Sequence, residues 1–510
     1  MLPIDLIRKA AARTPAAVAV EGPGFALSYA ALLADVDALA AGLQATDPTP
    51  QSRVGICAYN TREHLIALLA VMAAEKTWVP LNPRDAKPEL DAKIAATRPS
   101  ILIADEDCLD KFTPFDGARL ILGKTGSNAL DSVAGLIARN GGRAPARTHP
   151  PLDAPQAIKF TGGSSGKPKG VLQPYRAWNA GAASMIHALE LTARDKYLLA
   201  APLTHGTSCY VTPILAQGGT LVLLDGQTKP ASILDAFAER GVTTTFLPPT
   251  AIYMLLAEPG VGDRRYPALR NLIYGGAGMP PEKVRAAEAV FGKAIATNYG
   301  QTEAPQIITF MPPGEFTDAT YASAGRAGLL VELAVMDPSG RVVAAGTDGE
   351  IVLRGDLVMS GYLEMPELTA ATIKHGWLHT GDVGALDRRG YLFIKDRLRD
   401  VVISGGFNVY PSDVEAALVK HPAVYECVVF GMPDEKWGEA VTAAVQLHKG
   451  ADASADDIIA FAKTQVGSVK APKRVVFYDD LPRSSVGKVL RRAVKEREMK
   501  RPAGTSGGPS

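Results

Sequence analysis

The sequence predicts an α/β protein in which a large N-terminal domain precedes a small C-terminal one. Strand-like and helix-like segments alternate over residues 53–104 and again over residues 197–247, a pattern typical of doubly wound parallel sheets. Near residues 321–394 the alternation gives way to short β-rich runs. We therefore expect two doubly wound α/β subdomains and a small β-barrel-like subdomain, followed by a small, mobile α+β domain at the C-terminus.

The first subdomain follows from apolar spacing in the N-terminal third of the chain. We expect helices over residues 4–13, 29–43, 62–74 and 87–97, and strands over residues 17–20, 53–58, 78–81 and 100–104. Residues 122–155 are rich in Gly, Ala and Pro, so we expect a connecting segment there.

The second subdomain and the C-terminal domain follow from the same patterns. We expect helices over residues 176–190, 232–240, 411–420 and 455–466, and strands over residues 197–200, 219–224, 243–247, 331–336, 349–354, 391–395, 426–430, 442–447 and 474–478. Charged residues 396–400 predict a boundary between domains. The expected organisation is an N-terminal domain over 1–396, a hinge over 397–400, a C-terminal domain over 401–500 and a disordered polar tail over 501–510.

Composition excludes several classes of protein. The formal charge is +1, from 54 basic and 53 acidic residues, so a nucleic acid partner is not expected. The four cysteines are widely spaced, which indicates a reducing compartment and no structural zinc site. The start of the chain has no long apolar core, and no stretch has the length of a membrane span. We expect a cytoplasmic protein without stable membrane insertion.

A loop rich in glycine, hydroxyl and lysine residues predicts a phosphate site. Glycines allow a tight turn whose amide groups can bind an anion, while the hydroxyls and lysines add donors and positive charge. The spacing matches neither a Walker loop nor G-x-G-x-x-G. The loop consists of Thr161, Gly162, Gly163, Ser164, Ser165, Gly166, Lys167, Pro168 and Lys169.

This loop resembles the phosphate loop of the adenylate-forming superfamily, which comprises acyl-CoA synthetases, luciferases and amino-acid adenylation domains. One position departs from the family pattern, because Gly162 stands where a Ser is usual. The resemblance implies ATP as a substrate and Mg²⁺ as a cofactor. Further segments that resemble this family follow in the family's order over residues 155–490.

The segment after residue 297 resembles the family's nucleotide site. Its members are Asn298, Tyr299, Gly300, Gln301, Thr302 and Glu303. The resemblance assigns Thr302 and Glu303 to the ATP phosphates and to Mg²⁺, which prefers oxygen ligands. By the same resemblance Asp382, in Thr380-Gly381-Asp382, and Arg397 bind the ribose hydroxyls. The usual Gly before this Arg is Asp396 here.

The segment from Leu481 to Val489 resembles the family's catalytic-lysine loop. The resemblance implies that Lys488 bridges the substrate carboxylate and the ATP α-phosphate, where negative charge develops. Taken alone, Lys488 would read as a surface lysine. Rotation of the C-terminal domain in this family implies a hinge, which falls at Arg399 by motif position.

Two segments resemble the family's acyl pocket. The turn containing Gly276 and Ala277 lies between acyl group and adenine in the family, and His205 resembles an aromatic residue that gates the pocket. Residues 204–208 contain no acidic side chain that could pair with a substrate ammonium. An aryl, alicyclic or medium-chain fatty acid is therefore expected rather than an α-amino acid.

The acceptor is expected to be coenzyme A. Gly405 and Gly406 resemble a CoA-linked signature, Trp437 resembles a residue that stacks on the CoA adenine, and Lys473 matches a basic position that meets a CoA phosphate. The chain after Lys488 is too short for a fused carrier domain. A free-standing acyl-CoA synthetase is the favoured interpretation. Two alternatives stay open: an acyl-AMP ligase that loads a separate carrier protein, and a non-catalytic nucleotide-binding protein on this scaffold. The oligomeric state is not determined, and a homodimer is compatible with the sequence.

Overall fold

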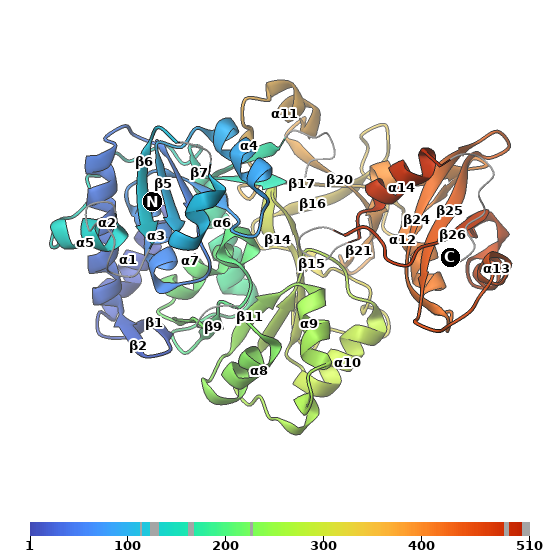
Figure 1. Cartoon of the computed structure of the whole chain (residues 1–510), viewed down its shortest axis with the longest axis horizontal. Coiled ribbons are helices and arrows are strands. Elements are labelled where there is room, and N and C mark those ends of the chain that lie inside the picture. Colours follow the sequence, from blue (N-terminus) through green and yellow to red (C-terminus); the bar gives the residue numbers. More distant parts are fainter. Residues whose placement is uncertain (113–114, 123–131, 162–167, 225–227, 484–488, 502–510) are drawn as a thin grey trace. The chain divides into compact units, whose positions relative to one another are not determined.

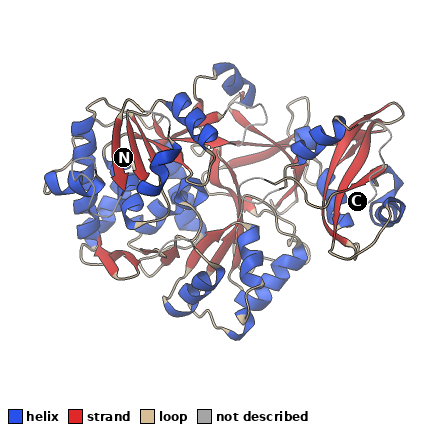
Figure 2. Cartoon of the chain, viewed as in Figure 1, coloured by secondary structure: helices blue, strands red, loops and turns tan. Residues whose placement is uncertain are grey.

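The computed structural model describes residues 1–112, 115–122, 132–161, 168–224, 228–483 and 489–501. The chain divides into two compact units. The first consists of Met1–Leu333 and Val352–His379, and the second of Ala334–Ile351 and Thr380–Ser510. Figure 2 shows helices and strands mixed throughout both units, so the predicted α/β class is confirmed. The proposed hinge at residues 397–400 stays a prediction.

A seven-stranded sheet in the first unit has the order β18-β8-β7-β4-β3-β5-β6. Strands β6, β5, β3, β4 and β7 each run parallel to their neighbours, an arrangement that requires crossover connections. The strands are β3 (Arg53–Cys57), β4 (Thr77–Leu81), β5 (Ile101–Asp105), β6 (Ala118–Leu122), β7 (Pro155–Thr161), β8 (Lys169–Pro174) and β18 (Gly361–Tyr362). The central β4 is buried along its whole length, as expected for a parallel strand covered on both faces.

A nine-stranded sheet in the same unit has the order β15-β14-β13-β12-β11-β9-β10-β1-β2. Antiparallel strands occur at both edges, with β2 on one side and β14 and β15 on the other. The strands are β1 (Val18–Gly22), β2 (Phe25–Ser28), β9 (Lys196–Leu198), β10 (Thr220–Val222), β11 (Thr244–Leu247), β12 (Asn271–Tyr274), β13 (Ile295–Gln301), β14 (Ala304–Met311) and β15 (Arg326–Ala327).

Helices cover both sheets. Figure 1 shows α8, α9 and α10 grouped beside β11, and α1, α2 and α3 grouped near β5. A single large apolar core joins the helices to the two sheets. The helices of this unit are α1 (Pro3–Arg13), α2 (Tyr29–Thr46), α3 (Arg62–Ala73), α4 (Lys87–Thr97), α5 (Val133–Arg139), α6 (Tyr175–Ala188), α7 (Ser208–Ala216), α8 (Pro230–Glu239), α9 (Pro249–Leu256), α10 (Pro281–Phe291) and α11 (Pro366–Thr372).

A five-stranded sheet corresponds to the predicted β-rich subdomain. Its order is β16-β17-β20-β19, with β21 paired to β20. The strands are β16 (Glu332–Met336), β17 (Gly349–Arg354), β19 (Ile373–Lys374), β20 (Trp377–Leu386) and β21 (Leu392–Arg397). The division between the two units falls within the residues of this sheet.

The C-terminal sheet has the order β23-β22-β25-β24, with β26 parallel to β25. Its apolar face packs on α12 and α13 in a core of its own. The elements are β22 (Val402–Ser404), β23 (Phe407–Val409), α12 (Pro411–Leu418), β24 (Val424–Asp434), β25 (Gly438–Leu447), α13 (Ala455–Lys470), β26 (Arg474–Phe477) and α14 (Arg491–Met499).

The predicted connecting segment at residues 122–155 is more structured than expected. It contains helix α5, whose N-cap Ser132 accepts a hydrogen bond from the backbone of Gly135. The helix packs on α2: the Cβ of Leu136 comes 3.3 Å from where Gly42 would carry a Cβ, so the pairing depends on a glycine in α2. The Gly- and Pro-rich composition of the segment concealed this short helix.

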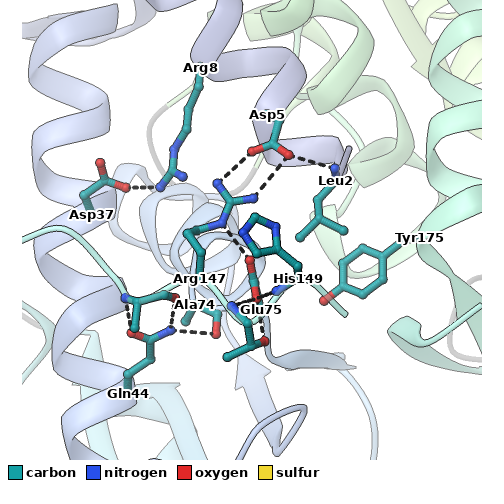
Figure 3. A network of polar contacts seen from close by, with 12 residues as sticks. Leu2, Asp5, Arg8, Asp37, Gln44, Ala74, Glu75, Arg147, His149 and Tyr175 are labelled. Atoms are coloured by element: carbon teal, nitrogen blue, oxygen red, sulfur yellow. Dashed lines mark hydrogen bonds and ion pairs between the residues drawn. The ribbon is translucent and has the colours of Figure 1, made fainter. Parts of the chain in front are cut away.

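A buried carboxylate fixes the rest of that segment. Figure 3 shows Glu75, which follows α3, within a network that reaches the N-terminal helix. Glu75 accepts hydrogen bonds from Arg147 Nε at 2.7 Å and from the Thr148 amide and hydroxyl, both at 2.6 Å. Arg147 also pairs with Asp5 of α1 at 2.9 Å. The network joins three segments that lie far apart in sequence. Within the described ranges, no helix is long and apolar enough to cross a membrane.

Candidate functional site

The predicted phosphate loop joins two paired strands. Thr161 at the end of β7 pairs with Lys169 at the start of β8, so both ends of the loop are fixed at one hairpin. Residues Gly162, Gly163, Ser164, Ser165, Gly166 and Lys167 lie outside the described part of the chain. Their role in phosphate binding stays a prediction.

Lys159 enters this hairpin as a buried cation, with 7% of its surface exposed. Its Nζ donates to Ser208 Oγ at 2.8 Å and to the carbonyl of His205 at 3.1 Å. The ammonium also lies 5.0 Å from the ring centre of Trp78 and 5.4 Å from that of Trp178. Burial lowers the pKa of this lysine. From the sequence we counted Lys159 among the lysines at the start of the phosphate-loop stretch but did not predict that its ammonium is buried.

The Asn298–Glu303 segment occupies the end of β13 and the turn into β14. Gly300 is required there, because an added Cβ would lie 2.5 Å from the backbone nitrogen of Gln306. The pairing between β13 and β14 shifts its register between Tyr299 and Gln301, so β14 bulges at this point. Gly300 thus allows the bulged part of β14 to pack closely against the Asn298–Glu303 segment.

Thr302 and Glu303 are fixed by residues of neighbouring strands. Gln173 Nε2 donates to the Thr302 carbonyl at 2.8 Å, and the Tyr362 hydroxyl donates to Glu303 Oε1 at 2.8 Å. Burial, followed by the adjacent Glu303 carboxylate, raises the pKa of Tyr362. A positioned carboxylate beside a threonine is an oxygen donor set that suits Mg²⁺ shared with phosphate. Gln173 and Tyr362 were not predicted, since neither belongs to a segment with a recognisable motif.

The turn after β12 contains the predicted adenine-side glycines. Gly276 has φ +79°, a conformation that favours glycine, and it is exposed together with Ala277. Gly275 is buried, and a Cβ at this position would lie 2.2 Å from Asn298 Oδ1. The structure therefore brings the turn against the Asn298 end of the nucleotide segment. Contact with adenine stays a prediction.

His205 lies in a short π-helical turn, Leu203–Thr207, that precedes α7. Its Nδ1 is 2.9 Å from Thr204 Oγ1. Surrounding protein atoms and then repulsion from Lys159 lower its pKa, although part of the ring still reaches solvent. The imidazole is thus held neutral near pH 7. This suits a packing or gating role better than that of a proton donor.

The second unit brings the two predicted ribose ligands together. Asp382 on β20 pairs in register with Arg397 on β21, and Arg397 Nε lies 2.8 Å from Asp382 Oδ1. Asp382 is buried, whereas half of the Arg397 side-chain surface is exposed. A carboxylate can accept hydrogen bonds from the two hydroxyls of a diol.

The predicted CoA residues also assemble within the second unit. The amide of Gly405 donates to the carbonyl of Trp437 at 2.8 Å, and Gly405 and Gly406 both have positive φ. Lys436 and Lys473 place their ammonium groups 5.1 Å and 5.2 Å from the Trp437 ring centre. Lys473 Nζ, however, donates to three backbone carbonyls at the end of α13, of Ser468, Val469 and Ala471. It caps this helix end, which the sequence did not indicate.

Lys488 lies outside the described residues, but the base of its loop is described. Arg483 and Val489 form an antiparallel bridge, so the loop is closed at both ends. Arg491 follows directly and binds three carboxylates: Asp396 at 3.2 Å, Asp400 at 3.1 Å and Glu415 at 2.8 Å. Asp396 precedes the predicted hinge and Asp400 is its last residue, so α14 is tied to the hinge segment. Arg399 itself is exposed and lies 3.7 Å from Asp400.

Comparisons with known proteins found similar sequences and structures. The family model "AMP-binding enzyme" matches residues 7–363, and its C-terminal domain model matches residues 413–488. A feruloyl-CoA synthase from Amycolatopsis is 34% identical over 95% of this chain and 96% of its own. The medium/long-chain-fatty-acid–CoA ligase FadD8 of Mycobacterium tuberculosis is 39% identical over 68% of this chain, a match that spans 62% of FadD8. ATP-bound MatB from Rhodopseudomonas palustris superposes with a TM-score of 0.87 at 29% identity, covering 98% of this chain and 99% of MatB.

Proposed function

Because this chain belongs to the AMP-binding enzyme family, we propose that it is an AMP-forming acid–CoA ligase. It joins a carboxylic acid to the thiol of CoA, and ATP is cleaved to AMP and pyrophosphate. The observation that carries the proposal is the fixed turn at Thr302–Glu303. There Gln173 and Tyr362 hold an oxygen donor set in a chain that matches the family over most of its length.

In the first half-reaction a carboxylate oxygen of the acid attacks the α-phosphorus of ATP, and pyrophosphate leaves. The loop from Thr161 to Lys169 holds the departing phosphates. Thr302 and Glu303 would hold Mg²⁺, which when bound neutralises phosphate charge. Asp382 and Arg397 orient the ribose, and Lys488 stabilises the charge that develops at the α-phosphate.

In the second half-reaction the CoA sulfur attacks the acyl carbonyl and AMP leaves. The surface formed by Gly405, Gly406 and Trp437 binds the CoA nucleotide. No protein nucleophile is required, because the CoA sulfur is itself the nucleophile. A thiol with a pKa near 8.5 is partly ionised at neutral pH, so a strong base is not essential. The hinge at residues 397–400 lets the C-terminal domain serve both steps.

The substrate is an aryl, alicyclic or medium-chain acid. Residues 204–208 offer no carboxylate to the amino group of an amino acid. The Lys159 ammonium donates to Ser208 and to the His205 carbonyl, so we do not assign it to a second carboxylate of the substrate. The proposed cytoplasmic location and homodimer rest on the sequence alone.

A ligase that loads the acyl group onto a separate carrier protein is the second candidate. One observation favours it: the Lys473 donors are engaged at the end of α13 rather than directed to solvent. Such an enzyme would make the same acyl-adenylate but would not turn over with free CoA.

Pyrophosphate release with ATP and Mg²⁺ tests the proposal across aryl, alicyclic and C2–C18 acids, with and without CoA. Acid-dependent release that turns over steadily only with CoA is the expected result. Release that stops after one turnover and is not restored by CoA would support the carrier-protein ligase. The absence of release with every acid would contradict both candidates.

A further inference from the structure

Lys159 is a buried cation for which the described residues provide no carboxylate. It lies on β7, two residues before the phosphate loop begins at Thr161. Only 7% of its surface is exposed, and no carboxylate within the described ranges pairs with its ammonium. Instead the ammonium faces the rings of Trp78 and Trp178, which are themselves buried. A buried charge without a counter-ion is costly, so this lysine calls for an explanation.

The ammonium of Lys159 holds the backbone of the turn that carries His205. Its Nζ donates to the His205 carbonyl at 3.1 Å and to Ser208 Oγ at 2.8 Å, and the Ser208 hydroxyl donates to the same carbonyl at 2.8 Å. His205 has φ −111° and ψ −146°, so its backbone departs from helical geometry within the turn. A backbone carbonyl that leaves a helix needs other donors, and here two side chains supply them.

Two further contacts fix the rest of the same turn. Asn60 Oδ1 accepts a hydrogen bond from the Leu203 amide at 2.8 Å, which fixes the start of the turn. An added Cβ at Gly206 would lie 2.7 Å from Gln306 Oε1, so Gly206 packs directly on the Gln306 side chain. Lys159 acts between these two contacts, at the residue of the turn whose backbone angles are non-helical. Loss of its ammonium would therefore release the turn at that residue.

The turn presents the His205 side chain to solvent. Lys159, Thr204 and Ser208 are buried, whereas His205 is exposed. The imidazole Nδ1 is 2.9 Å from Thr204 Oγ1, so the ring is oriented by its own turn. The hydrogen bonds that shape the backbone thus lie inside the protein, and the side chain that they orient is accessible to a ligand.

Lys159 also influences the charge of His205. After burial, repulsion from the Lys159 ammonium is the next cause that lowers the pKa of the imidazole. Lys93 and Arg84 act in the same direction, while Asp85 opposes them. Lys93 is paired with Asp85 at 2.6 Å, so the effects of these two charges on the ring oppose each other. Among the charged groups, Lys159 therefore contributes most to keeping the imidazole neutral.

We propose that Lys159 is a positioning residue for the part of the site that binds the acid: it holds the turn Leu203–Thr207 in the shape that presents His205 to the substrate. The inference rests on the proposed ligase function, in which His205 borders the acyl pocket. Lys159 touches neither ATP nor the acid in this role. Removing its ammonium should therefore weaken the use of the acid more than the use of ATP.

Lys159→Met tests the inference, because methionine keeps an unbranched side chain between the two tryptophans but has no charge and no N–H donor. Pyrophosphate release is measured with the acid that the wild-type chain uses best. kcat/KM for this acid should fall by about 10-fold, mainly through a higher KM for the acid, while KM for ATP should change by less than about 2-fold. The His205 carbonyl keeps the Ser208 hydroxyl as a donor, so the loss of stability should be small.

A second measurement follows His205 in the absence of substrates. In protein labelled at histidine, NMR titration should show a higher imidazole pKa for His205 in Lys159→Met than in the wild-type chain, because a nearby positive charge is lost. The resonance of His205 is identified by its absence in His205→Gln.

Lys76 provides a matched control. It is also a buried lysine, 2% exposed, and its Nζ donates to the carbonyls of Asp47 and Thr49 at 2.7 and 3.2 Å and to Ser52 Oγ at 2.6 Å. None of these groups belongs to the proposed site. Lys76→Met should leave KM for the acid and the imidazole titration unchanged. The melting temperature of Lys159→Met should fall no further than that of Lys76→Met.

Four results would overturn the inference. An unchanged KM for the acid in Lys159→Met, with pyrophosphate release intact, would leave the ligase function standing and remove Lys159 from it. An equal rise of KM in Lys76→Met would assign the effect to the removal of any buried ammonium. An imidazole pKa that stays at its wild-type value would show that Lys159 does not act on His205. No release with any acid would overturn the proposed function and this inference with it.

Discussion

The Glu75–Arg147 network and the Asn298–Gln306 pair lie in the same compact unit, but their polar atoms are satisfied to different degrees. Both Glu75 oxygens accept hydrogen bonds, and the carboxylate is 1% exposed (Figure 3). Asn298 is similarly buried, yet its Oδ1 has no partner within the described residues. Complete pairing stabilises a scaffold, whereas an unpaired buried atom lowers stability and suits a ligand. Substitutions in the two regions should therefore separate stability from activity.

The largest effect is expected at Lys488, the proposed catalytic lysine. Lys488→Ala should lower the rate of adenylate formation by about 10³-fold, because the developing phosphate charge loses its cation. The free energy of unfolding should not change. Acid-dependent pyrophosphate release and urea unfolding measure the two quantities. Lys500→Ala, at the C-terminal end of α14, is the control. Undiminished release would remove Lys488 from the mechanism.

The largest loss of stability is expected at Glu75. Glu75→Gln removes a buried negative charge beside Arg147 and places an amide donor against the Thr148 and His149 donors, so it should lower the free energy of unfolding by about 3 kcal/mol. The activity of the protein that remains folded should be unchanged. Glu332→Gln, in an exposed pair with Arg354, should cost less than about 1 kcal/mol. Equal losses in the two variants would show that burial of Glu75 is not what makes its network stabilising.

The Glu75 network should also depend on pH. Burial opposes ionisation of Glu75, but hydrogen bonds from Thr148 and Arg147 outweigh it and lower the pKa of the carboxyl below its ordinary 4.5. Its contribution is therefore present above pH 4.5 and is lost as pH falls through the lower, folded-state pKa. The difference in unfolding free energy between wild type and Glu75→Gln should shrink over that range. A difference that stays constant down to pH 3 would contradict this.

A smaller effect on activity is expected at Glu303. Glu303→Gln keeps an oxygen that can accept from Tyr362, so stability should be retained, but the ligand for Mg²⁺ loses its charge. Adenylate formation should fall by about 30-fold at low Mg²⁺ and recover in part as Mg²⁺ rises. Titration of pyrophosphate release with Mg²⁺ checks this. An identical Mg²⁺ dependence in both proteins would exclude Glu303 as a ligand.

The proposed hinge at residues 397–400 belongs to neither of the two regions compared above. A substitution there should slow one half-reaction more than the other. Arg399→Pro restricts the backbone where the C-terminal domain is proposed to rotate. Thioester formation should slow by about 10-fold more than adenylation. Single-turnover rates for each half-reaction measure the difference, and equal losses would move the hinge elsewhere.

The smallest effect is expected on stability at Asn298. Asn298→Leu removes an unpaired buried oxygen but also two hydrogen bonds of its Nδ2, so the free energy of unfolding should change by less than about 1 kcal/mol. Urea unfolding measures it. A loss as large as that of Glu75→Gln would show that Asn298 is a scaffold residue.

The sequence was sufficient for most strands and helices because their periodic apolar pattern reflects burial directly. It also singled out Asp382 and Arg397, which the structure pairs across β20 and β21, whereas their contact with ribose stays a prediction. The family prediction is confirmed by the match over residues 7–363. The short helix α5 was missed because its composition suggested a connection.

The unpredicted features depend on tertiary contacts. Gln306 is positioned by a bulge in β14 and by close contact with Gly300 and Gly206, and Gly206 lies far from it in the sequence. Lys473 appeared to be free for a phosphate, but the carbonyls at the end of α13 engage it. Tyr362 reaches Glu303 from a strand that sequence reasoning did not identify. Patterns in a chain report periodicity and composition, but not which side chains meet.

The central claim is that the reaction passes through an acyl-adenylate. The transfer of ¹⁸O from the acid to AMP tests this claim most directly. The preferred acid is labelled with ¹⁸O in both carboxylate oxygens and incubated with ATP, Mg²⁺ and CoA, and the nucleotide product is analysed by mass spectrometry. If the carboxylate attacks the α-phosphorus, each AMP carries one ¹⁸O, and one molecule of acyl-CoA is formed for each AMP. Unlabelled AMP, or label in inorganic phosphate formed with ADP, would contradict an acyl-adenylate.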